Sequence, residues 1–284
     1  AHFTPQACEL IVREAKRRAD KGKELTTRFR DLGGIVRAAG DIAKENNHKL
    51  VHENDVQLAL DKIKSIESQM ISRYVDNRRN YSLISTEGSE IGKVNGLAVI
   101  GQAPPYAGMV MGIEAEVTPG GRKGEIFATG KLGDIAKESI TNISAIMKKA
   151  FGDDIKDSKD IYVQFVQAYN VDGDSASIAI ATAIFSAYFK IPIKQSIAMT
   201  GSLSIRGEVL PIGGVSAKVE GAHEQGIHRV IVPQTNMQDL IIKEELQNKM
   251  KIISVSYFYE VLEEMLEWSD KNKHILEDIK KAIN

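Results

Sequence analysis

The sequence has little cysteine: Cys8 is the single one among 284 residues. One thiol excludes an internal disulfide framework and a zinc site built from several cysteines, and it fits a reducing, cytoplasmic compartment. No apolar run reaches the roughly 18 residues that span a bilayer, and the start of the chain lacks the hydrophobic region of a signal peptide. We therefore expect a soluble protein, and a first residue, Ala1, that is not methionine indicates a piece of a longer one.

An excess of charge of either sign is also missing. Lys and Arg number 37 against 38 Asp and Glu, which gives a formal net charge of −1. Without an overall basic field we expect no nucleic-acid partner. Nothing in this chain implies a membrane, although an anchor outside it stays open. With 43% hydrophobic residues, the composition is that of a globular protein of one or two domains.

Three well-known site motifs are absent from the sequence. There is no G-x-x-x-x-G-K-[ST] loop to cradle nucleotide phosphates and no G-x-S-x-G nucleophile elbow. His223 and His228 are five residues apart, which on one helix separates them by about 140°. The helical zinc motif instead needs two histidines on one face. We expect two surface histidines here and no metal site.

Residues 1–80 are expected to form a small all-α domain. The first helix should begin with Thr4 as its cap and Pro5 in its first turn, because a short polar side chain and a proline both suit a helix start. Gly22 is expected to stop this helix. The pattern therefore predicts a helix from Pro5 to just before Gly22 at the start of the domain.

Two further helices are expected in this domain, the first within residues 32–46 and the second within residues 53–75. The second has an apolar stripe at helical spacing, made of Val56, Leu60, Ile63, Ile66 and Met70. Residues 76–88 are polar and indicate an exposed linker to the next domain.

Residues 81–284 predict a larger α/β (α+β) domain with mixed sheets and flanking helices. Residues 109–117 alternate apolar and other side chains, which predicts a half-buried strand. Further strands are expected at 126–130, 161–166, twice within 197–210, 229–233 and 251–255. Helices are expected at 134–151, 175–190, 215–226, 236–249, 257–268 and 274–283.

Ser175 stands where the acidic run "DGD" meets a long helix of small and apolar residues. One reading is an ordinary helix cap, since Asp and Ser are favoured there. The other is a nucleophile beside the unpaired N–H groups and the positive end of the helix dipole, which suit an oxyanion. The serine alone does not decide between them.

Lys218 lies on or beside the apolar stripe of its expected helix, between Val215 and Ala222. In one reading its methylene stem packs on the core and its ammonium reaches water. In the other, the amine is poorly solvated, so that its pKa falls toward neutrality and the neutral amine can take a proton from a hydroxyl. The position alone leaves both open.

Four segments resemble the proteolytic domain of Lon proteases. "GDSAS", which contains Ser175, precedes the lysine of "LPIGGVSAK" by 43 residues, and "EIFATGKLGDIAKESI" and "MTGSLSIRGEVLPIGG" match further Lon motifs in the same order. "GDSAS" in place of "GPSAG" is closest to the B-type subfamily. The resemblance covers about residues 90–268 and implies a Lon-type serine–lysine proteolytic domain.

The N-terminal helices resemble the small α-helical subdomain of the Lon ATPase module. "RDLGGIVRAAGDIA" is similar to its sensor-2 segment, which places Arg37 at the arginine that reads bound nucleotide. Without the resemblance, Arg37 is a solvated helix residue. ATP with Mg is the cofactor implied for the full-length protein, and peptide hydrolysis itself needs none.

The resemblance implies that Ser175 is the nucleophile and Lys218 the general base. It places the hydroxyl of Thr200 against the lysine, where the residues alone suggest a strand-end threonine bonded in a turn. Asp172 and Asp174 are acids that the family places around the dyad, or else loop acids that favour a helix N-terminus. An ion pair with Lys218 would hold it protonated, and catalysis would then require a rearrangement.

The function implied is ATP-dependent serine endopeptidase activity on unfolded or misfolded proteins by a homohexamer, through an acyl-enzyme. Two alternatives stay open. The first is an ATP-independent Lon-like peptidase, and the second is a non-proteolytic Lon-fold module that serves assembly or partner binding. The presence of both Ser175 and Lys218 argues against the second alternative.

Overall fold

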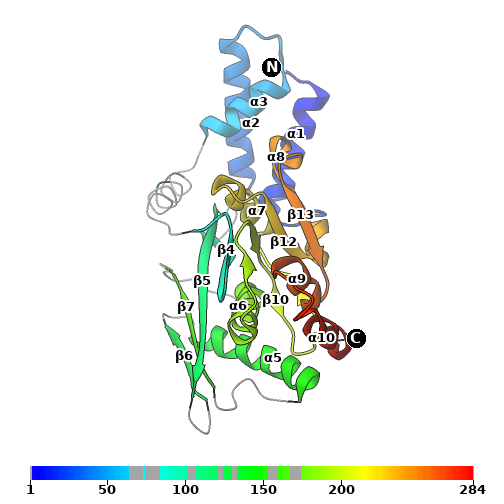
Figure 1. Ribbon diagram of the computed structural model, residues 1–284. Coiled ribbons are helices and arrows are strands. Elements are labelled where there is room, and N and C mark those ends of the chain that lie inside the picture. The colour runs from blue at the N-terminus through cyan, green and yellow to red at the C-terminus, as the bar shows by residue number, and fades with distance from the viewer. Residues whose placement is uncertain are drawn as a thin grey trace.

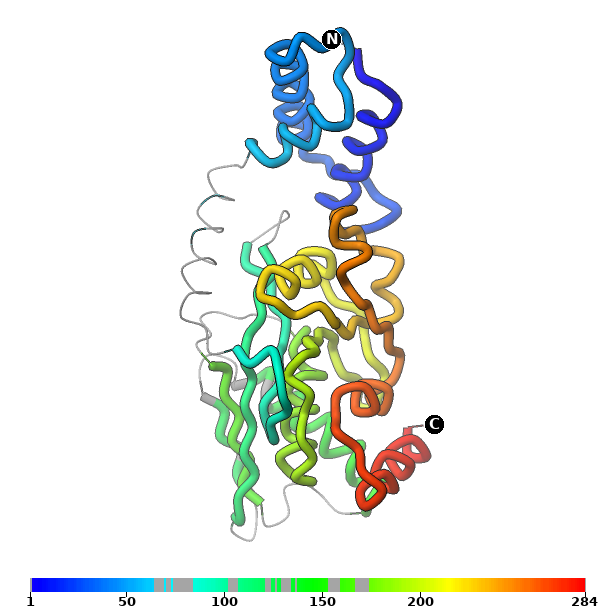
Figure 2. The backbone as a smooth tube through the Cα atoms, turned by 45° about the horizontal axis from the view of Figure 1, so that its top comes forward, coloured from blue at the N-terminus to red at the C-terminus, as the bar shows by residue number. Residues whose placement is uncertain are grey.

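The computed structural model describes residues 2–63, 69, 73, 84–101, 107–120, 124–129, 133–152, 159–166 and 174–283. The N-terminal helices stand at one end of an elongated molecule and α10 lies toward the other (Figures 1 and 2). The boundary expected near residue 80 falls outside the described residues, so it stays a prediction. No helix in the described part is long and apolar enough to cross a membrane.

The N-terminal unit is small and mainly helical, as expected. Its core is made of alanines and branched side chains that the three helices turn toward one another, with Ala7, Ile35, Ala39 and Val56 fully or almost fully buried. A short parallel pairing of β1 with β2 ties the start of the chain to this core. The elements are β1 (His2–Phe3), α1 (Pro5–Ala19), α2 (Phe29–Glu45), β2 (Leu50–Val51) and α3 (Glu53–Lys62).

Helix α1 begins as the sequence predicts and ends earlier. The Thr4 hydroxyl accepts the Ala7 N–H at 3.3 Å, and Pro5 is the first helical residue. The expected stop at Gly22 is wrong, because Asp20 already takes the left-handed conformation, with φ 56°, and caps the helix. Aspartate is one of the few residues other than glycine that tolerate this conformation.

The third expected helix is shorter than the pattern suggests. Helix α3 ends at Lys62, and Ile63 leaves helical geometry with φ −94° and ψ 87°. A continuous helix over 53–75 is therefore wrong. Ile66 and Met70 of the expected stripe, and most of the expected linker, lie outside the described residues.

The larger unit is built on a seven-stranded mixed sheet with the order β13-β12-β9-β4-β5-β7-β6. The four strands from β13 to β4 are parallel, β5 runs antiparallel between β4 and β7, and β6 is parallel to β7. This agrees with the mixed sheet that the sequence predicts. The strands are β4 (Lys93–Ile100), β5 (Ala107–Pro119), β6 (Ile126–Thr129), β7 (Lys159–Phe165), β9 (Ile197–Met199), β12 (Arg229–Pro233) and β13 (Lys251–Val255).

Two antiparallel pairs of very short strands lie outside the sheet. They are β3 (Ser89–Glu90) with β8 (Ile193–Lys194), and β10 (Ser202–Leu203) with β11 (Val209–Leu210).

Helices cover both faces of the sheet. On β12, Ile231 faces the larger core, while Val230 and Val232 face the smaller one. The larger core packs against α5 (Gly133–Phe151), α6 (Ser177–Phe189), α9 (Phe258–Met265) and α10 (Lys273–Ile283). The smaller core packs against α7 (Val215–Glu224), α8 (Glu244–Gln247) and the segment around the 3₁₀ turn Gln234–Gln238.

Strand β5 is half-buried only in its second half. There Ile113 and Ala115 are buried while Glu116 is exposed, as the alternation predicts. In the first half, Val110 belongs to the smaller core and Met111 is also buried, because helices cover both faces. A strand enclosed on two sides does not keep an apolar–polar alternation.

The single helix expected over 236–249 is wrong. The chain forms a 3₁₀ turn at Gln234–Gln238, and only Glu244–Gln247 are α-helical. Asn236 accepts the Ile212 N–H at 2.8 Å and donates to the Ile212 carbonyl at 2.9 Å. These distant contacts, together with Ser216 accepting the Ile241 N–H, fix a conformation that local helical periodicity does not reveal.

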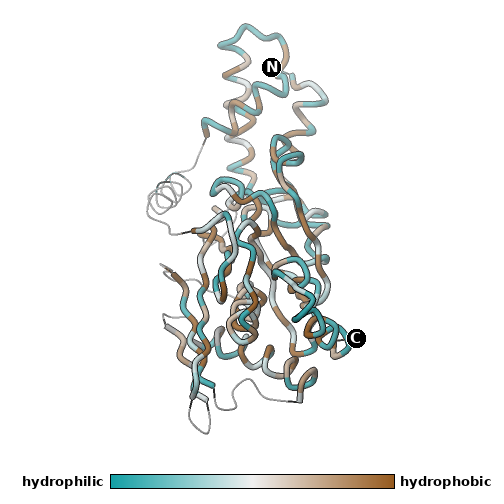
Figure 3. Tube along the Cα trace, viewed as in Figure 1, coloured by the Kyte–Doolittle hydropathy of each residue, from teal (hydrophilic) through white to brown (hydrophobic). Residues whose placement is uncertain are grey.

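Helix α6 is enclosed on all sides. Every residue from Ser177 to Ala187 is buried, and the helix is a mostly white and brown element at the centre of Figure 3. A helix without a polar face is typical of the middle of a core. Its N-terminal end therefore offers a firmly held position to the residues that precede it.

Candidate active site

The site lies where three elements meet at the end of strand β9. Thr200 directly follows β9, and Ser175 lies in a 3₁₀ turn, Asp174–Ala176, that leads into α6. Lys218 lies in the first turn of α7. Helices α6 and α7 cover opposite faces of the sheet. The carboxyl end of parallel strands is the usual place for an α/β site.

Hydrogen bonds join the three residues in a chain. Lys218 Nζ donates to Thr200 Oγ1 at 3.1 Å, and Thr200 Oγ1 donates to the main-chain carbonyl of Ser175 at 3.2 Å. The Gly201 N–H donates to the same carbonyl at 2.9 Å. Ser175 Oγ and Lys218 Nζ, both described, form no direct hydrogen bond with each other. Thr200 thus fixes the lysine amine relative to the main chain that carries the serine.

Lys218 is one of the largest fully buried side chains, with 1% of its surface exposed. Burial lowers its pKa from the ordinary 10.5 to about 8, against the opposing effects of Asp20 and Asp174. The charged form is disfavoured because the surroundings replace water with apolar groups. Of the two readings left open by the sequence, the buried amine is confirmed and the solvated ammonium is wrong.

Of the two acids that the resemblance places near the dyad, the structure describes only Asp174. Asp174 is exposed and, among the described residues, forms no ion pair with Lys218, although its charge raises the lysine pKa. Asp172 lies outside the described residues. The ion-paired arrangement is therefore absent for Asp174, and the role of Asp172 stays a prediction.

The N-terminal end of α6 has one of its N–H groups already paired. The Ile178 N–H donates to the Gly201 carbonyl at 3.2 Å, and the Ser177 hydroxyl donates to the Asp174 carbonyl at 2.5 Å. Ser175 itself precedes the helix proper and is half-buried. It can therefore contact a ligand while its main chain is held by Thr200 and Gly201.

Helix α7 is seated directly on the backbone of β5, a feature that the sequence analysis missed. A Cβ built on Gly108 would lie 1.8 Å from the Ala217 carbonyl oxygen and 3.0 Å from the Lys218 Cα. On the helix side, Gly221 meets Gly108. An isolated glycine inside a strand signals such a close approach, but Gly108 precedes the expected strand 109–117 and Gly221 lies in a helix, so this signal was not readable.

Asp20 is a second residue that the sequence analysis missed. Its carboxylate accepts the N–H of Gly214, the residue before α7, at 2.6 Å, and its charge acts on Lys218. Asp20 and Gly214 are 194 residues apart and belong to different units. No local pattern in the sequence pointed to this contact.

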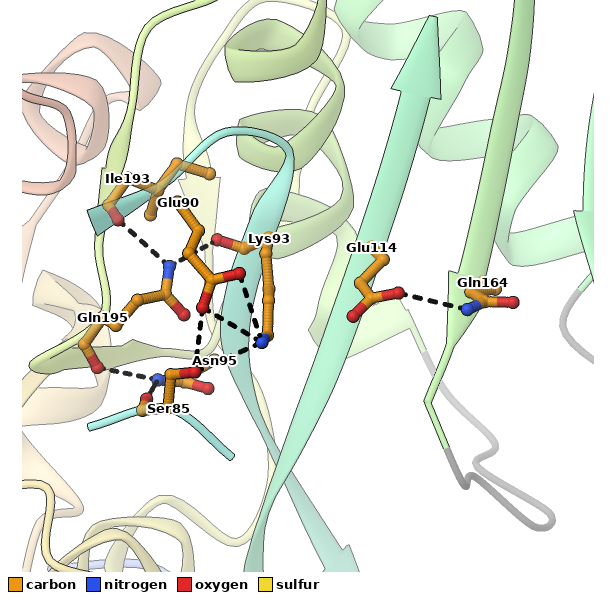
Figure 4. Close-up of polar contacts among 8 residues, drawn as sticks. All are labelled: Ser85, Glu90, Lys93, Asn95, Glu114, Gln164, Ile193 and Gln195. Carbon is orange, nitrogen blue, oxygen red and sulfur yellow. Dashed lines mark hydrogen bonds and ion pairs between the residues drawn. The ribbon is translucent and has the colours of Figure 1, made fainter. Parts of the chain in front are cut away.

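The other end of β9 is held by two buried amides (Figure 4). Asn95 Nδ2 donates to the carbonyls of Ser85 and Gln195, both at 2.8 Å. Gln195 Nε2 donates to the Lys93 carbonyl, also at 2.8 Å. These bonds join β4 to the turn before β9, and so fix the short strand that ends just before Thr200.

Arg37 takes no part in this chain of bonds and lies on the exposed face of α2. Within the described ranges, no hydrogen bond or ion pair holds its guanidinium. An exposed guanidinium fits a contact with a phosphate group of a ligand bound from outside, but its role as a nucleotide sensor stays a prediction.

His223 and His228 meet, contrary to the expected separation. Helix α7 ends at Glu224, and Gly226 takes φ 82°, so the two Nδ1 atoms lie 3.1 Å apart. The expected separation of about 140° is wrong, because a single helix does not run through both residues. Across the described part of the chain, no group of three or more His, Cys, Asp or Glu side chains could hold a metal ion.

Comparisons with known proteins give two family matches that together span most of the chain. Residues 65–268 match the Lon protease (S16) C-terminal proteolytic domain. Residues 2–65 match the archaeal LonB AAA+ ATPase LID domain. Both agree with the resemblance seen in the sequence motifs.

Individual relatives give the same result. The chain is 50% identical to the archaeal Lon proteases of Pyrococcus abyssi and Thermococcus kodakarensis over 99% of its length, and 48% identical to that of Archaeoglobus fulgidus over 98%. It covers 28%, 44% and 45% of those three relatives. The chain therefore spans less than half the length of these curated relatives.

Proposed function

The chain belongs to the Lon protease family, and from this premise we propose that it hydrolyses peptide bonds with Ser175 as nucleophile and Lys218 as general base. One observation carries the proposal: a fully buried lysine amine is bonded to Thr200, whose hydroxyl is bonded to the carbonyl of Ser175. This arrangement supplies a hydroxyl and an amine of lowered pKa at one place.

The first step is acylation of Ser175. The neutral Lys218 amine accepts the hydroxyl proton as Ser175 Oγ attacks the carbonyl carbon of the peptide. Thr200 accepts one amine N–H, which leaves the lone pair of the neutral amine for the serine proton. Main-chain N–H groups near the start of α6 stabilise the oxyanion.

The second half returns the enzyme to its starting state. The protonated Lys218 donates its proton to the leaving amine as the C–N bond breaks, which leaves an ester on Ser175. Water then attacks the ester with Lys218 again accepting a proton, and Ser175 Oγ leaves with that proton restored. No metal ion or cofactor enters these steps.

The full-length protein is proposed to use ATP with Mg to unfold its substrates. The LID-domain match supports this, and the exposed Arg37 is the residue of this chain that would contact a nucleotide phosphate. Unfolded or misfolded proteins as substrates, a homohexameric assembly and a cytoplasmic location belong to the same proposal.

The test is hydrolysis of casein and of a short fluorogenic peptide by full-length protein, with and without ATP. We expect Ser175→Ala and Lys218→Ala to lose nearly all turnover while their circular dichroism spectra match the wild type. A serine-directed acylating inhibitor should modify Ser175 in the wild type. Turnover near the wild-type level in either variant, with an unlabelled Ser175, would refute the proposed dyad. Equal casein turnover without ATP would refute the ATP requirement alone.

A further inference from the structure

The segment that ends α1 is bonded to the larger unit by two reciprocal hydrogen bonds, one at the start of α7 and one after the 3₁₀ turn Gln234–Gln238. Asp20 Oδ2 accepts the Gly214 N–H at 2.6 Å, and Asp239 Oδ1 accepts the Gly22 N–H at 3.1 Å. A carboxylate of each unit thus binds a main-chain N–H of the other. Hydrogen bonds to an ionised acceptor are roughly twice as strong as neutral ones, so this is a firm connection.

Gly214 links this connection to the proposed active site. It takes φ 70°, a left-handed conformation that favours glycine, and it is the residue before α7. Its carbonyl accepts the Lys218 N–H at 2.9 Å. Gly214 therefore bonds to Asp20 through its N–H and to the main chain of Lys218 through its carbonyl.

Helix α1 also contacts α7 beyond the lysine. Arg17 Nη1 lies 3.6 Å from the carboxylate of Glu220, a buried residue two positions after Lys218. Arg17 is itself held by Glu14 at 2.7 Å, and Arg13 donates to the Ile242 carbonyl at 2.7 Å. The N-terminal unit thus contacts α7 on both sides of Lys218.

Charge adds to the geometry. Two acids face Lys218, Asp20 from the end of α1 and Asp174 from the turn before α6, and both raise its pKa against the lowering by burial. The pKa of Asp20 is itself raised, chiefly by burial and also by Asp239, while the Gly214 N–H and Lys218 lower it. A proton on Asp20 and a proton on Lys218 are therefore coupled.

We propose that Asp20 is a positioning residue for peptide hydrolysis, which holds Gly214 and through it the Lys218 amine, so that the N-terminal helical unit and the proteolytic site move together. This inference rests on the proposed function. In this proposal the LID-type unit acts directly on the proteolytic site, because its Asp20 carboxylate binds the residue before α7 and raises the pKa of the general base.

Two substitutions at this position separate charge from anchoring. Asp20→Asn removes the charge and keeps an oxygen that can accept the Gly214 N–H, and asparagine tolerates the left-handed backbone. Asp20→Gly removes both charge and acceptor without backbone strain. Asp41→Asn, at an exposed aspartate of α2, is the matched control for loss of one negative charge in the same unit.

The measurement is the pH dependence of kcat/KM for a short peptide, in full-length protein. With Asp20→Asn we expect the acid limb to move to lower pH by roughly half a unit, since a nearby negative charge is lost. With Asp20→Gly we expect the same shift and a roughly tenfold lower kcat, because the amine is less well placed. Asp41→Asn should match the wild type in both limb and kcat.

A second measurement does not depend on turnover. The titration of Lys218, followed by NMR of ¹³C-labelled lysine and assigned with Lys218→Met, should show the same downward shift in Asp20→Asn. An unchanged titration in both Asp20 variants would overturn the inference, even with an active wild type and an inactive Ser175→Ala. An inactive wild type with the shift present would refute the proposed function and leave the coupling of Asp20 to Lys218 supported.

Discussion

Gly108 on β5 and Gly221 on α7 meet with no side chain between them. A Cβ built on Gly221 would lie 2.7 Å from the Gly108 Cα and 2.3 Å from its carbonyl carbon. Real Cβ atoms do not approach main-chain atoms so closely, so the helix rests directly on the strand. The position of Lys218 at the end of the sheet therefore depends on the absence of a side chain at both Gly108 and Gly221.

A methyl group at this contact should displace α7. We expect Gly108→Ala to lower the free energy of unfolding by at least about 2 kcal/mol, because overpacking a close contact forces a backbone shift, and to reduce peptide hydrolysis more than tenfold. Gly34→Ala in α2 is the control, since nothing lies within 4 Å of a Cβ at Gly34; it should be neutral or stabilising. Urea unfolding and peptide turnover measure both, and a Gly108→Ala protein with wild-type stability would contradict the contact.

The hydroxyl of Thr200 should matter more than its shape. Thr200→Val keeps the volume but removes both the acceptor for Lys218 and the donor to the Ser175 carbonyl. We expect kcat to fall by roughly tenfold to a hundredfold, because the amine loses its fixed position. Thr200→Ser restores the hydroxyl and should recover most of the activity. If Val and Ser variants behave alike, the hydrogen-bond chain has no part in turnover.

The pH dependence of hydrolysis should follow the pKa of Lys218. Only the neutral amine can accept a proton, so kcat/KM should rise with pH and level off above about 8. Asp174→Asn removes a charge that raises this pKa, and the acid limb should move to lower pH. Because Asp174 is exposed, salt should screen the effect. Profiles at low and high ionic strength check this, and identical limbs at low salt would count against it.

The buried Lys218 should lower the free energy of unfolding at neutral pH. Its pKa is about 8 in the folded protein against 10.5 ordinarily, so the folded state binds protons less readily than the unfolded state. Below pH 8 both states are protonated and the full penalty applies, about 3 kcal/mol. Between pH 8 and 10.5 the unfolded state binds more protons, and stability rises with pH.

Lys218→Met should therefore be inactive and more stable than the wild type at pH 7. The gain should be smaller than the full penalty, since the bond to Thr200 is lost, and it should fade as the pH passes from 8 to 10.5. Thermal unfolding at pH 7 and pH 10 measures this. A variant that is less stable than the wild type at pH 7 would show that the lysine is not held at a cost.

Local patterns in the sequence predict a small helical unit and an α/β unit, whereas the central residues of the site follow from the resemblance to Lon proteases. Helix starts such as Thr4–Pro5 depend on neighbours along the chain, and strands such as Arg229–Pro233 are short runs of branched apolar residues. Ser175, Thr200 and Lys218 stand in motifs whose spacing reflects the fold, and the structure brings all three together.

What the sequence does not reveal depends on distant partners. Asp20 has its role only because Gly214 folds next to it, and 194 residues separate them. The expected helix over 236–249 fails because Asn236 bonds to Ile212, in a different segment. The two histidines meet because the helix stops at Glu224, which a fixed angle per residue does not anticipate.

The enclosure of α6 has a consequence for how a displacement of the N-terminal unit reaches the site. A helix that is buried from Ser177 to Ala187 cannot tilt or slide without opening the core. The amides of these residues should therefore be among the last to exchange with deuterium. Ser175 lies in the turn that leads directly into this helix. The position of Lys218 depends instead on the close glycine contact between α7 and β5 and on the bond from Asp20 of the N-terminal unit. A displacement of the N-terminal unit is therefore expected to reach the lysine before it reaches the serine.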